Sequence, residues 1–218
     1  MILTKNDKPL RIIGIPQSTI TQEGAYFITG QDKFKGDFAV ITPEDFLSLA
    51  DKDQFQYLCM FTLDTVKRLE VIDLLDNQNL DCFSYVHNSA VIYKDLLSLP
   101  WDEVVDTIGR GTVISPFTSV LLNSKINNHC LIETYCLISH YSELKRNVIL
   151  HSGTMIAGKT TIGANSVFNF KSSAINALTI CADVEVGAMS NVTKDIEKPG
   201  RYLGSVARYM GERIPFDG

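Results

Sequence analysis

Four histidines, His87, His129, His140 and His151, are the side chains best suited to move a proton near neutral pH. An unperturbed imidazole has a pKa of about 6.5, so it can take a proton from an amine or a hydroxyl group and make that group a nucleophile. His87 and His129 have no evident chemical partner in the sequence, and we interpret both as structural. The roles of His140 and His151 depend on the elements that hold them.

A six-residue repeat holds three of these histidines. Every sixth residue is apolar in the unbroken series Ile108, Ile114, Val120, Ile126, Ile132, Ile138, Leu144, Leu150, Ile156, Ile162, Phe168, Ala174, Ile180, Val186 and Val192. Four residues after most of these positions stands a small or β-branched residue, from Thr112 to Ser190. A period of six fits neither the 3.6 residues of an α-helix nor the 2 of a single strand. It is typical of a hexapeptide β-helix.

Each hexad predicts one short strand and one corner, and three hexads close a triangular coil. Residue i then stacks on residue i+18, with coils about 4.8 Å apart. The repeat predicts about five coils. His140 follows the inward-pointing Ile138 by two residues, so it projects outward or stands at a corner, and Gly158 lies one coil away on the same face. His151 directly follows the inward-pointing Leu150, and we interpret it as a surface or interface residue.

The first hundred residues follow a different pattern. Short strands are expected at Leu10–Ile15, Ala25–Thr29, Phe38–Ile41, Gln56–Phe61 and Cys82–Val86, and helices at Pro43–Asp51 and at about Asp64–Leu75. Strands that alternate with helices predict a small α/β domain with a mainly parallel sheet. Only Gly14 follows the first strand and Pro16 removes an N–H donor, so no dinucleotide site is expected there. The link at about Asp95–Thr107 could carry a short helix.

Composition excludes several classes of function. The net charge is −5 with acidic and basic residues interspersed, which argues against a nucleic-acid partner. No run of 18 apolar residues and no signal peptide is recognisable, so we expect a cytoplasmic protein with no membrane partner. The five cysteines show no Cys-x-x-Cys spacing, and no metal site is expected. Cys130 and Cys136 occupy the small inward slot of the hexad and are interpreted as buried apolar residues.

More than half of the chain resembles the hexapeptide-repeat family of bacterial sugar O-acyltransferases, which includes sialic acid O-acetyltransferases and nucleotide 4-amino-sugar N-acetyltransferases. The segments that carry the resemblance are Ser84-Tyr-Val-His-Asn-Ser-Ala-Val91, Gly111-Thr-Val-Ile-Ser-Pro116, Ser139-His140, Ile156-Ala-Gly158, Thr161-Ile-Gly163, Val192-Thr-Lys-Asp195 and Gly204-Ser-Val-Ala-Arg208. The resemblance implies a degenerate Rossmann-like α/β domain over residues 1–100, a left-handed β-helix over residues 101–198 and a C-terminal extension over residues 199–218.

The resemblance also implies an activity. Family members transfer an acetyl group from acetyl-CoA to an amino or hydroxyl group of a sugar in surface polysaccharide pathways, and they work as homotrimers with the cofactor in a groove between two subunits. Here His140 matches the family's general base, and the backbone N–H of Gly158 matches the donor to the oxyanion. The family's cofactor path corresponds to Ile149, Gly158, Phe170 and Ala188, and the phosphates could meet Lys159, Lys194 or Arg208.

This sequence departs from the family at three points. Tyr141 follows the base where members usually carry an acid or a small polar residue, so it could donate a hydrogen bond or pack at the subunit interface. Ile149 stands where many members carry a second histidine, and the N-terminal glycine-rich loop is missing. Two alternatives therefore stay open. One is a catalytically altered or non-catalytic trimeric scaffold, and the other is an acyltransferase with a non-nucleotide acceptor.

Overall fold

The computed structural model describes residues 2–3, 8, 10–13, 43–61, 65–93 and 107–212. The strands expected at Ala25–Thr29 and Phe38–Ile41, and nearly all of the expected link at Asp95–Thr107, lie outside these ranges. The chain forms two compact units. One comprises Met1–Leu3 and Ser84–Ile214, and the other comprises Thr4–Phe83 and Pro215–Gly218.

The second unit has the expected α/β character. Its strands β2 (Leu10–Ile13), β3 (Gln56–Cys59) and β4 (Asp81–Cys82) form a parallel sheet in that order. Helix α1 (Pro43–Ser48) ends earlier than expected and is followed by the 3-10 turn η1 (Lys52–Gln54), whereas α2 (Thr65–Asn77) runs slightly longer than expected. One apolar core joins these elements and includes Ile13, Phe46, Tyr57, Cys59, Val71, Ile72, Leu75 and Leu80.

The single strand expected at Cys82–Val86 is wrong, because Phe83 divides it. The Phe83 side chain is buried, and its backbone N–H donates to the carbonyl of Tyr57, which holds this residue against the α/β sheet. The chain then enters β5 (Ser84–Val86), which pairs in parallel with β7 of the other unit's repeat. Strand β5 and the next strand, β6 (Val91–Ile92), therefore precede the boundary expected at residue 101 and already belong to the coils.

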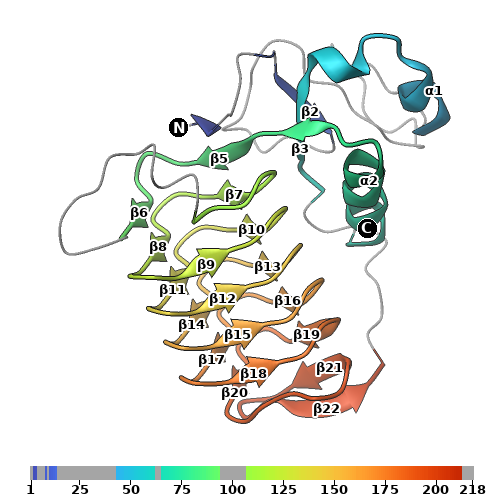
Figure 1. Cartoon of the computed structure of the whole chain (residues 1–218). Helices are drawn as coiled ribbons and strands as arrows, with labels where there is room; N and C mark the ends of the chain where they lie inside the picture. Colours follow the sequence, from blue (N-terminus) through green and yellow to red (C-terminus); the bar gives the residue numbers. More distant parts are fainter. Residues whose placement is uncertain are drawn as a thin grey trace. The chain divides into compact units, whose positions relative to one another are not determined.

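The first unit is the expected left-handed parallel β-helix (Figure 1). One side of the prism stacks β5, β7 (Val113–Ile114), β10 (Leu131–Ile132), β13 (Ile149–Leu150), β16 (Val167–Phe168), β19 (Val184–Val186) and β21 (Gly200–Leu203). The second side stacks β6, β8 (Ser119–Val120), β11 (Leu137–Ile138), β14 (Met155–Ile156), β17 (Ser173–Ala174) and β20 (Asn191–Val192). The third side stacks β9 (Lys125–Ile126), β12 (Glu143–Leu144), β15 (Thr161–Ile162) and β18 (Thr179–Ile180).

Both predicted inward series fill the prism. Each apolar residue of the hexad series is buried, and so is each residue of the second series from Thr112 to Ser190. Residue i pairs with residue i+18 throughout the regular coils, as Ile138 does with Ile156. Cys130 and Cys136 are buried as predicted and form no disulfide with a described residue, and burial raises the pKa of the Cys136 thiol to about 12. The hexad therefore fixes the register of the whole prism.

Each corner turns on one residue with left-handed backbone. Every sixth residue from Gly111 to Met189 has a φ between 53° and 76°, although only Gly111 and Gly153 in this series are glycines. A left-handed residue other than glycine ordinarily costs about 1–2 kcal/mol. The cost is offset because the N–H at this position bonds to the coil below, as Lys159 N–H does to the carbonyl of His140 at 2.9 Å. Corner geometry thus repeats as regularly as the strands.

The two ends of the prism are less regular. Val86 pairs with Ile114, so the first coil takes 28 residues where later coils take 18. At the other end, β21 and β22 (Arg208–Gly211) form an antiparallel hairpin, and Tyr202 and Ala207 pack against the prism core. Strand β1 (Ile2–Leu3) pairs antiparallel with β5. Within the described ranges, no helix combines the length and apolarity needed to span a bilayer.

Candidate active site

The corners of the prism form three edges, which we name by their residues. The histidine edge joins the second and third sides and contains residues 139–142, 157–160, 175–178 and 193–195. The aromatic edge joins the first and second sides and contains residues 115–118, 133–136, 151–154, 169–172 and 187–190. The amide edge joins the third and first sides and contains residues 109–112, 127–130, 145–148 and 163–166.

The histidine edge brings His140 directly over Gly158. Strands β11 and β14 are in register, so the two residues occupy the same corner position in successive coils. A Cβ placed on Gly158 would lie 2.6 Å from Cε1 and 2.9 Å from Nε2 of the imidazole. Any side chain at position 158 would displace this ring. The glycine is therefore required by the close approach of the imidazole to the backbone.

The imidazole of His140 is open to solvent. Tyr141, which is also exposed, presents its ring edge-on to the imidazole, with centroids 5.6 Å apart and planes at 83°. Among the described residues no carboxylate pairs with His140 and neither ring nitrogen has a hydrogen-bond partner. The ring is thus accessible from solvent, and Tyr141 forms an aromatic wall beside it.

The backbone N–H of Gly158 is also unused within the described part of the chain. The N–H groups of both neighbouring residues form hydrogen bonds between coils. Ala157 N–H donates to the carbonyl of Ala174, and Lys159 N–H donates to the carbonyl of His140. No such bond involves the N–H of Gly158. A backbone donor with no described partner therefore lies beside the imidazole, in a residue that is itself buried.

The same register continues toward the C-terminal end of the prism. Asn176 and Lys194 follow Gly158 at successive intervals of eighteen residues, and both are exposed. At a coil spacing of about 4.8 Å, Lys194 lies roughly 14 Å from His140 along the edge. Sequence reasoning selected Lys194 but missed Asn176, although the 18-residue interval from His140 contained the signal.

The other residues of the expected cofactor path lie elsewhere in the chain. Phe170 and Ala188 are exposed on the aromatic edge, one coil apart. Ile149 lies on β13 and is enclosed, with 1% of its surface exposed. Arg208 is exposed on β22, beyond the last coil. The chain therefore distributes the expected path over two edges of the prism, strand β13 and the C-terminal hairpin.

His151 was expected at a surface or interface position. An open surface position is wrong, because an ion pair with Glu133 encloses the side chain on the aromatic edge. Its Nδ1 lies 3.1 Å from Oε1 of Glu133, and only 6% of the His151 side chain is exposed. Oε2 of Glu133 accepts hydrogen bonds from the backbone N–H and the hydroxyl of Ser152. Burial raises the pKa of Glu133, but the bonds from His151 and Ser152 outweigh it and lower the pKa overall. Phe170 stacks on the imidazole at 5.0 Å.

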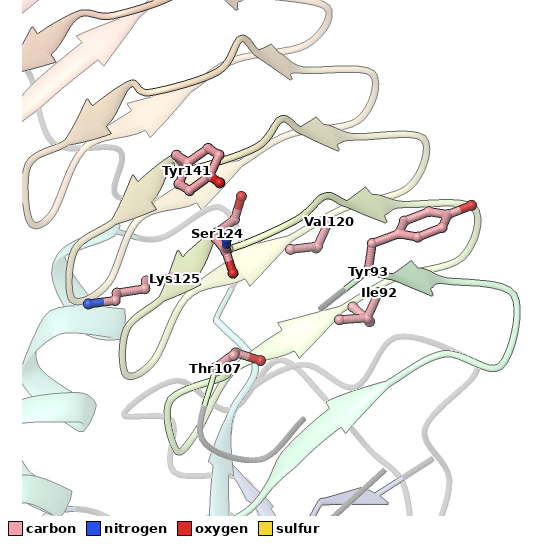
Figure 2. Close-up of a pocket in the computed structure, with 8 residues that line it drawn as sticks. Ile92, Tyr93, Thr107, Val120, Ser124, Lys125 and Tyr141 are labelled. Atoms are coloured by element: carbon pink, nitrogen blue, oxygen red, sulfur yellow. The ribbon is translucent and has the colours of Figure 1, made fainter. Parts of the chain in front are cut away.

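A pocket of about 360 Å³ lies against the histidine edge, on the N-terminal side of His140. Figure 2 shows its lining, which comes from three successive coils and consists of Ile92, Tyr93, Thr107, Val120, Asn123, Ser124, Lys125 and Tyr141. Apolar side chains dominate the lining, and Lys125 supplies one exposed cation. Because Tyr141 contacts both this pocket and the imidazole, the pocket adjoins the candidate base.

Comparisons with known proteins support this interpretation of the prism. No family model matches the chain. The chain is 29% identical over 119 residues to the UDP-3-O-acylglucosamine N-acyltransferase of Campylobacter curvus (strain 525.92). This match covers 55% of this chain and 34% of that protein. It is 28% identical over 102 residues to the protein of the same name from Bordetella avium (strain 197N), which covers 45% of this chain and 28% of the relative. The chain thus spans about a third of the length of these relatives.

Solved structures match nearly the whole chain. The acetyltransferase domain of PglB from Neisseria gonorrhoeae FA1090 superposes with a TM-score of 0.77 at 18% identity, covering 94% of this chain and 100% of that domain. The chain therefore shares the fold of this acetyltransferase domain. GDP-perosamine N-acetyltransferase from Caulobacter crescentus, solved with CoA and GDP-perosamine, gives a TM-score of 0.75 at 16% identity and covers 94% and 97% of the two chains. WeeI from Acinetobacter baumannii AYE gives 0.64 at 19% identity, with 93% and 99% covered.

Proposed function

We propose that this chain transfers an acetyl group from acetyl-CoA to the amino group of a nucleotide-activated sugar, with His140 as the general base. The observation that carries the proposal is the exposed imidazole held against the backbone of Gly158. The Caulobacter structure was solved with CoA and a nucleotide sugar, and the curated relatives are named N-acyltransferases of a nucleotide sugar. These names favour an amine over a hydroxyl acceptor. The proposal includes a cytoplasmic location and a role in surface polysaccharide synthesis.

The chemistry follows from the two groups at this corner. The acceptor amine attacks the thioester carbonyl while His140 takes the proton that the nitrogen loses. The carbonyl oxygen becomes an oxyanion, and a fixed N–H donor beside it stabilises the charge as it develops. In our proposal the N–H of Gly158 is this donor, because it lies beside the imidazole and no described group accepts a hydrogen bond from it.

The aromatic edge supplies a precedent within the same molecule. Ser152 occupies the corner position that corresponds to Gly158, and its backbone N–H donates to a carboxylate oxygen of Glu133 at 3.0 Å. A corner N–H of this prism can therefore hold a negatively charged oxygen at hydrogen-bond distance. We infer that Gly158 offers the same donor to a transient oxyanion.

The line from His140 to Lys194 suits an extended acyl-CoA. The acyl carbon would lie at Gly158, the pantetheine arm would pass Asn176, and Lys194 would meet a phosphate. This direction leaves the N-terminal side of His140 for the acceptor, where the pocket beside Tyr141 lies. Its apolar lining suits the less polar face of a deoxygenated sugar ring, and Lys125 could meet a diphosphate.

The proposal also places the site between two copies of the chain. Phe170 and Ala188 of the expected cofactor path lie on a different edge from Gly158. One CoA molecule could contact both sets if the aromatic edge of one copy faces the histidine edge of the next. A closed ring of such contacts gives the homotrimer, because each interface joins two different surfaces.

Calorimetry and turnover together test this function. Acetyl-CoA should bind with measurable heat, and the chain should release CoA thiol in the presence of one member of a panel of nucleotide amino sugars. His140→Ala should lower turnover by about 10³-fold, within the range for loss of a general base, while leaving the oligomer and its binding heat intact. His87→Ala, which alters a histidine bonded to Ser89, is the matched control and should keep turnover. Absence of binding heat would favour the scaffold alternative.

A further inference from the structure

Glu133 and His151 form a carboxylate–imidazole pair that the proposed chemistry does not use. Nδ1 of His151 lies at ion-pair distance from Glu133 (3.1 Å) but is buried without a hydrogen bond of good geometry. The opposite nitrogen, Nε2, has no hydrogen-bond partner among the described residues and belongs to a side chain that is 6% exposed. Ser152 holds the second oxygen of Glu133 with two hydrogen bonds, which keeps the carboxylate in place. A carboxylate at ion-pair distance from one ring nitrogen, with the other nitrogen unpaired, is an arrangement suited to proton transfer.

The turn itself does not require this pair. Ser115 and Asn169 occupy the same corner position as Glu133 and His151 in neighbouring coils, and these coils fold with the same strand register. Two ionisable groups are costly to enclose unless they are paired and hydrogen-bonded. The pair therefore has a cost that the fold alone does not explain.

Its position relates it to the proposed acyl-CoA site. Phe170, one of the residues expected along the cofactor path, stacks on the His151 ring and is itself half exposed. A cofactor that contacts Phe170 would pass close to His151. His140 lies on a different edge, so the two histidines could reach one thioester only from two copies of the chain.

We propose that His151, held by Glu133, is the general acid that protonates the departing sulfur of CoA, and that it acts from the copy next to the one that supplies His140. This inference rests on the proposed function. When the tetrahedral adduct collapses, the C–S bond breaks and its electron pair goes to sulfur. The Nε2 proton of the His151 imidazolium moves to that sulfur and yields the CoA thiol. His151 regains a proton from water, and the proton that His140 took from the acceptor returns to water.

Two substitutions separate this role from a structural one. His151→Gln keeps a hydrogen-bond donor near Glu133 but cannot deliver a proton, and His151→Ala removes both functions. Both should lower kcat by about 10²-fold and leave the binding of acetyl-CoA, measured by calorimetry, within about threefold. Restoration of kcat by glutamine would assign a purely structural role and overturn the proposal. Asn127→Ala, which removes a comparable bond to Glu143 on the amide edge, should leave kcat unchanged.

Mixed assemblies test the two-copy arrangement. His140→Ala and His151→Ala chains with different tags are co-expressed, and assemblies that carry both tags are purified. In a mixed trimer one interface joins an intact His140 to an intact His151, so roughly a third of the wild-type rate should return. A rate no higher than that of the two separate variants would overturn the arrangement. Failure of the proposed function would be distinct, since the wild-type chain would then show no turnover of acetyl-CoA.

Discussion

The prism contains two contacts in which an imidazole lies against a glycine, and they differ in exposure. On the histidine edge His140 lies over Gly158 and is open to solvent. On the amide edge His129 lies against Gly111, whose Cβ would come within 2.3 Å of Nδ1, and His129 is fully enclosed. The same local contact is thus enclosed at one edge and open to solvent at the other. Stacking on a glycine alone does not distinguish the two histidines, so our proposal for His140 rests on stacking combined with exposure and an unused N–H.

The largest difference between the two edges is expected when each glycine is replaced by alanine. Gly158→Ala displaces the imidazole of His140 and covers the proposed oxyanion donor, so kcat/KM should fall by two to three orders of magnitude, about what misplacement of catalytic groups costs. Its unfolding free energy should change little, because the exposed ring can move into solvent. Steady-state kinetics and urea unfolding measure the two effects.

Gly111→Ala is the matched substitution on the amide edge. The enclosed ring of His129 cannot move freely and the φ of +69° at position 111 disfavours alanine, so unfolding should become easier by about 2–3 kcal/mol. Its kcat/KM, measured per folded chain, should remain that of the wild type. If Gly111→Ala lost activity while Gly158→Ala kept it, the assignment of the two edges would be reversed.

Replacing each histidine by alanine tests the same difference between an enclosed and an exposed ring. His129→Ala leaves a cavity in an enclosed corner and should lower the unfolding free energy by about 3 kcal/mol. His140→Ala removes an exposed side chain and should change it by no more than about 0.5 kcal/mol. Urea unfolding of both variants at one pH provides the measurement. Equal destabilisation would show that His140 is also a packing residue.

The sequence predicted the prism far better than it predicted the corners. The hexad series located the strands and the inward residues, because a period of six has few structural solutions. It did not predict the left-handed backbone at Phe117, Tyr135 and Met189, since these residue types carry no turn signal of their own. Hydrogen bonds to the neighbouring coil impose the left-handed conformation at these corners, whichever residue type stands there.

The candidate site was predicted in part for the same reason. The 18-residue interval placed His140 beside Gly158, and the structure confirms this proximity. The same interval separates Glu133 from His151, yet treating His151 by itself led to a surface position. A search for ionisable residues eighteen apart would have found the pair. The pocket beside Tyr141 could not be predicted, because it lies where the first coil departs from the repeat.

The Glu133–His151 pair on the aromatic edge should make the stability of the fold depend on pH. The pKa of Glu133 is lowered on folding despite its burial, so its charge stabilises the fold above the unfolded pKa of about 4.3, and this contribution is lost as pH falls through the folded pKa. Glu133→Gln should lower the unfolding free energy at pH 7 by about 2 kcal/mol. The difference from wild type should shrink between about pH 5 and pH 3, as measured by thermal unfolding. A constant difference across this range would contradict the assignment.

The smallest effect is expected for a lysine on the histidine edge, which is compared with a lysine on the aromatic edge. Lys194 and Lys171 are both exposed, but only Lys194 lies in register with His140 and Gly158. Lys194→Ala should raise the KM for acetyl-CoA about fivefold, as expected for the loss of roughly 1 kcal/mol from one solvated phosphate contact, and added salt should reduce the difference. Lys171→Ala controls for the loss of a surface charge and should change KM by less than about twofold.

Acetyl-pantetheine, which lacks the nucleotide phosphates, should give the same KM with Lys194→Ala as with the wild-type chain. A KM defect that persisted with this shorter donor would mean that Lys194 acts on the fold or on the acyl arm, and the CoA would then have to run toward the other end of the prism.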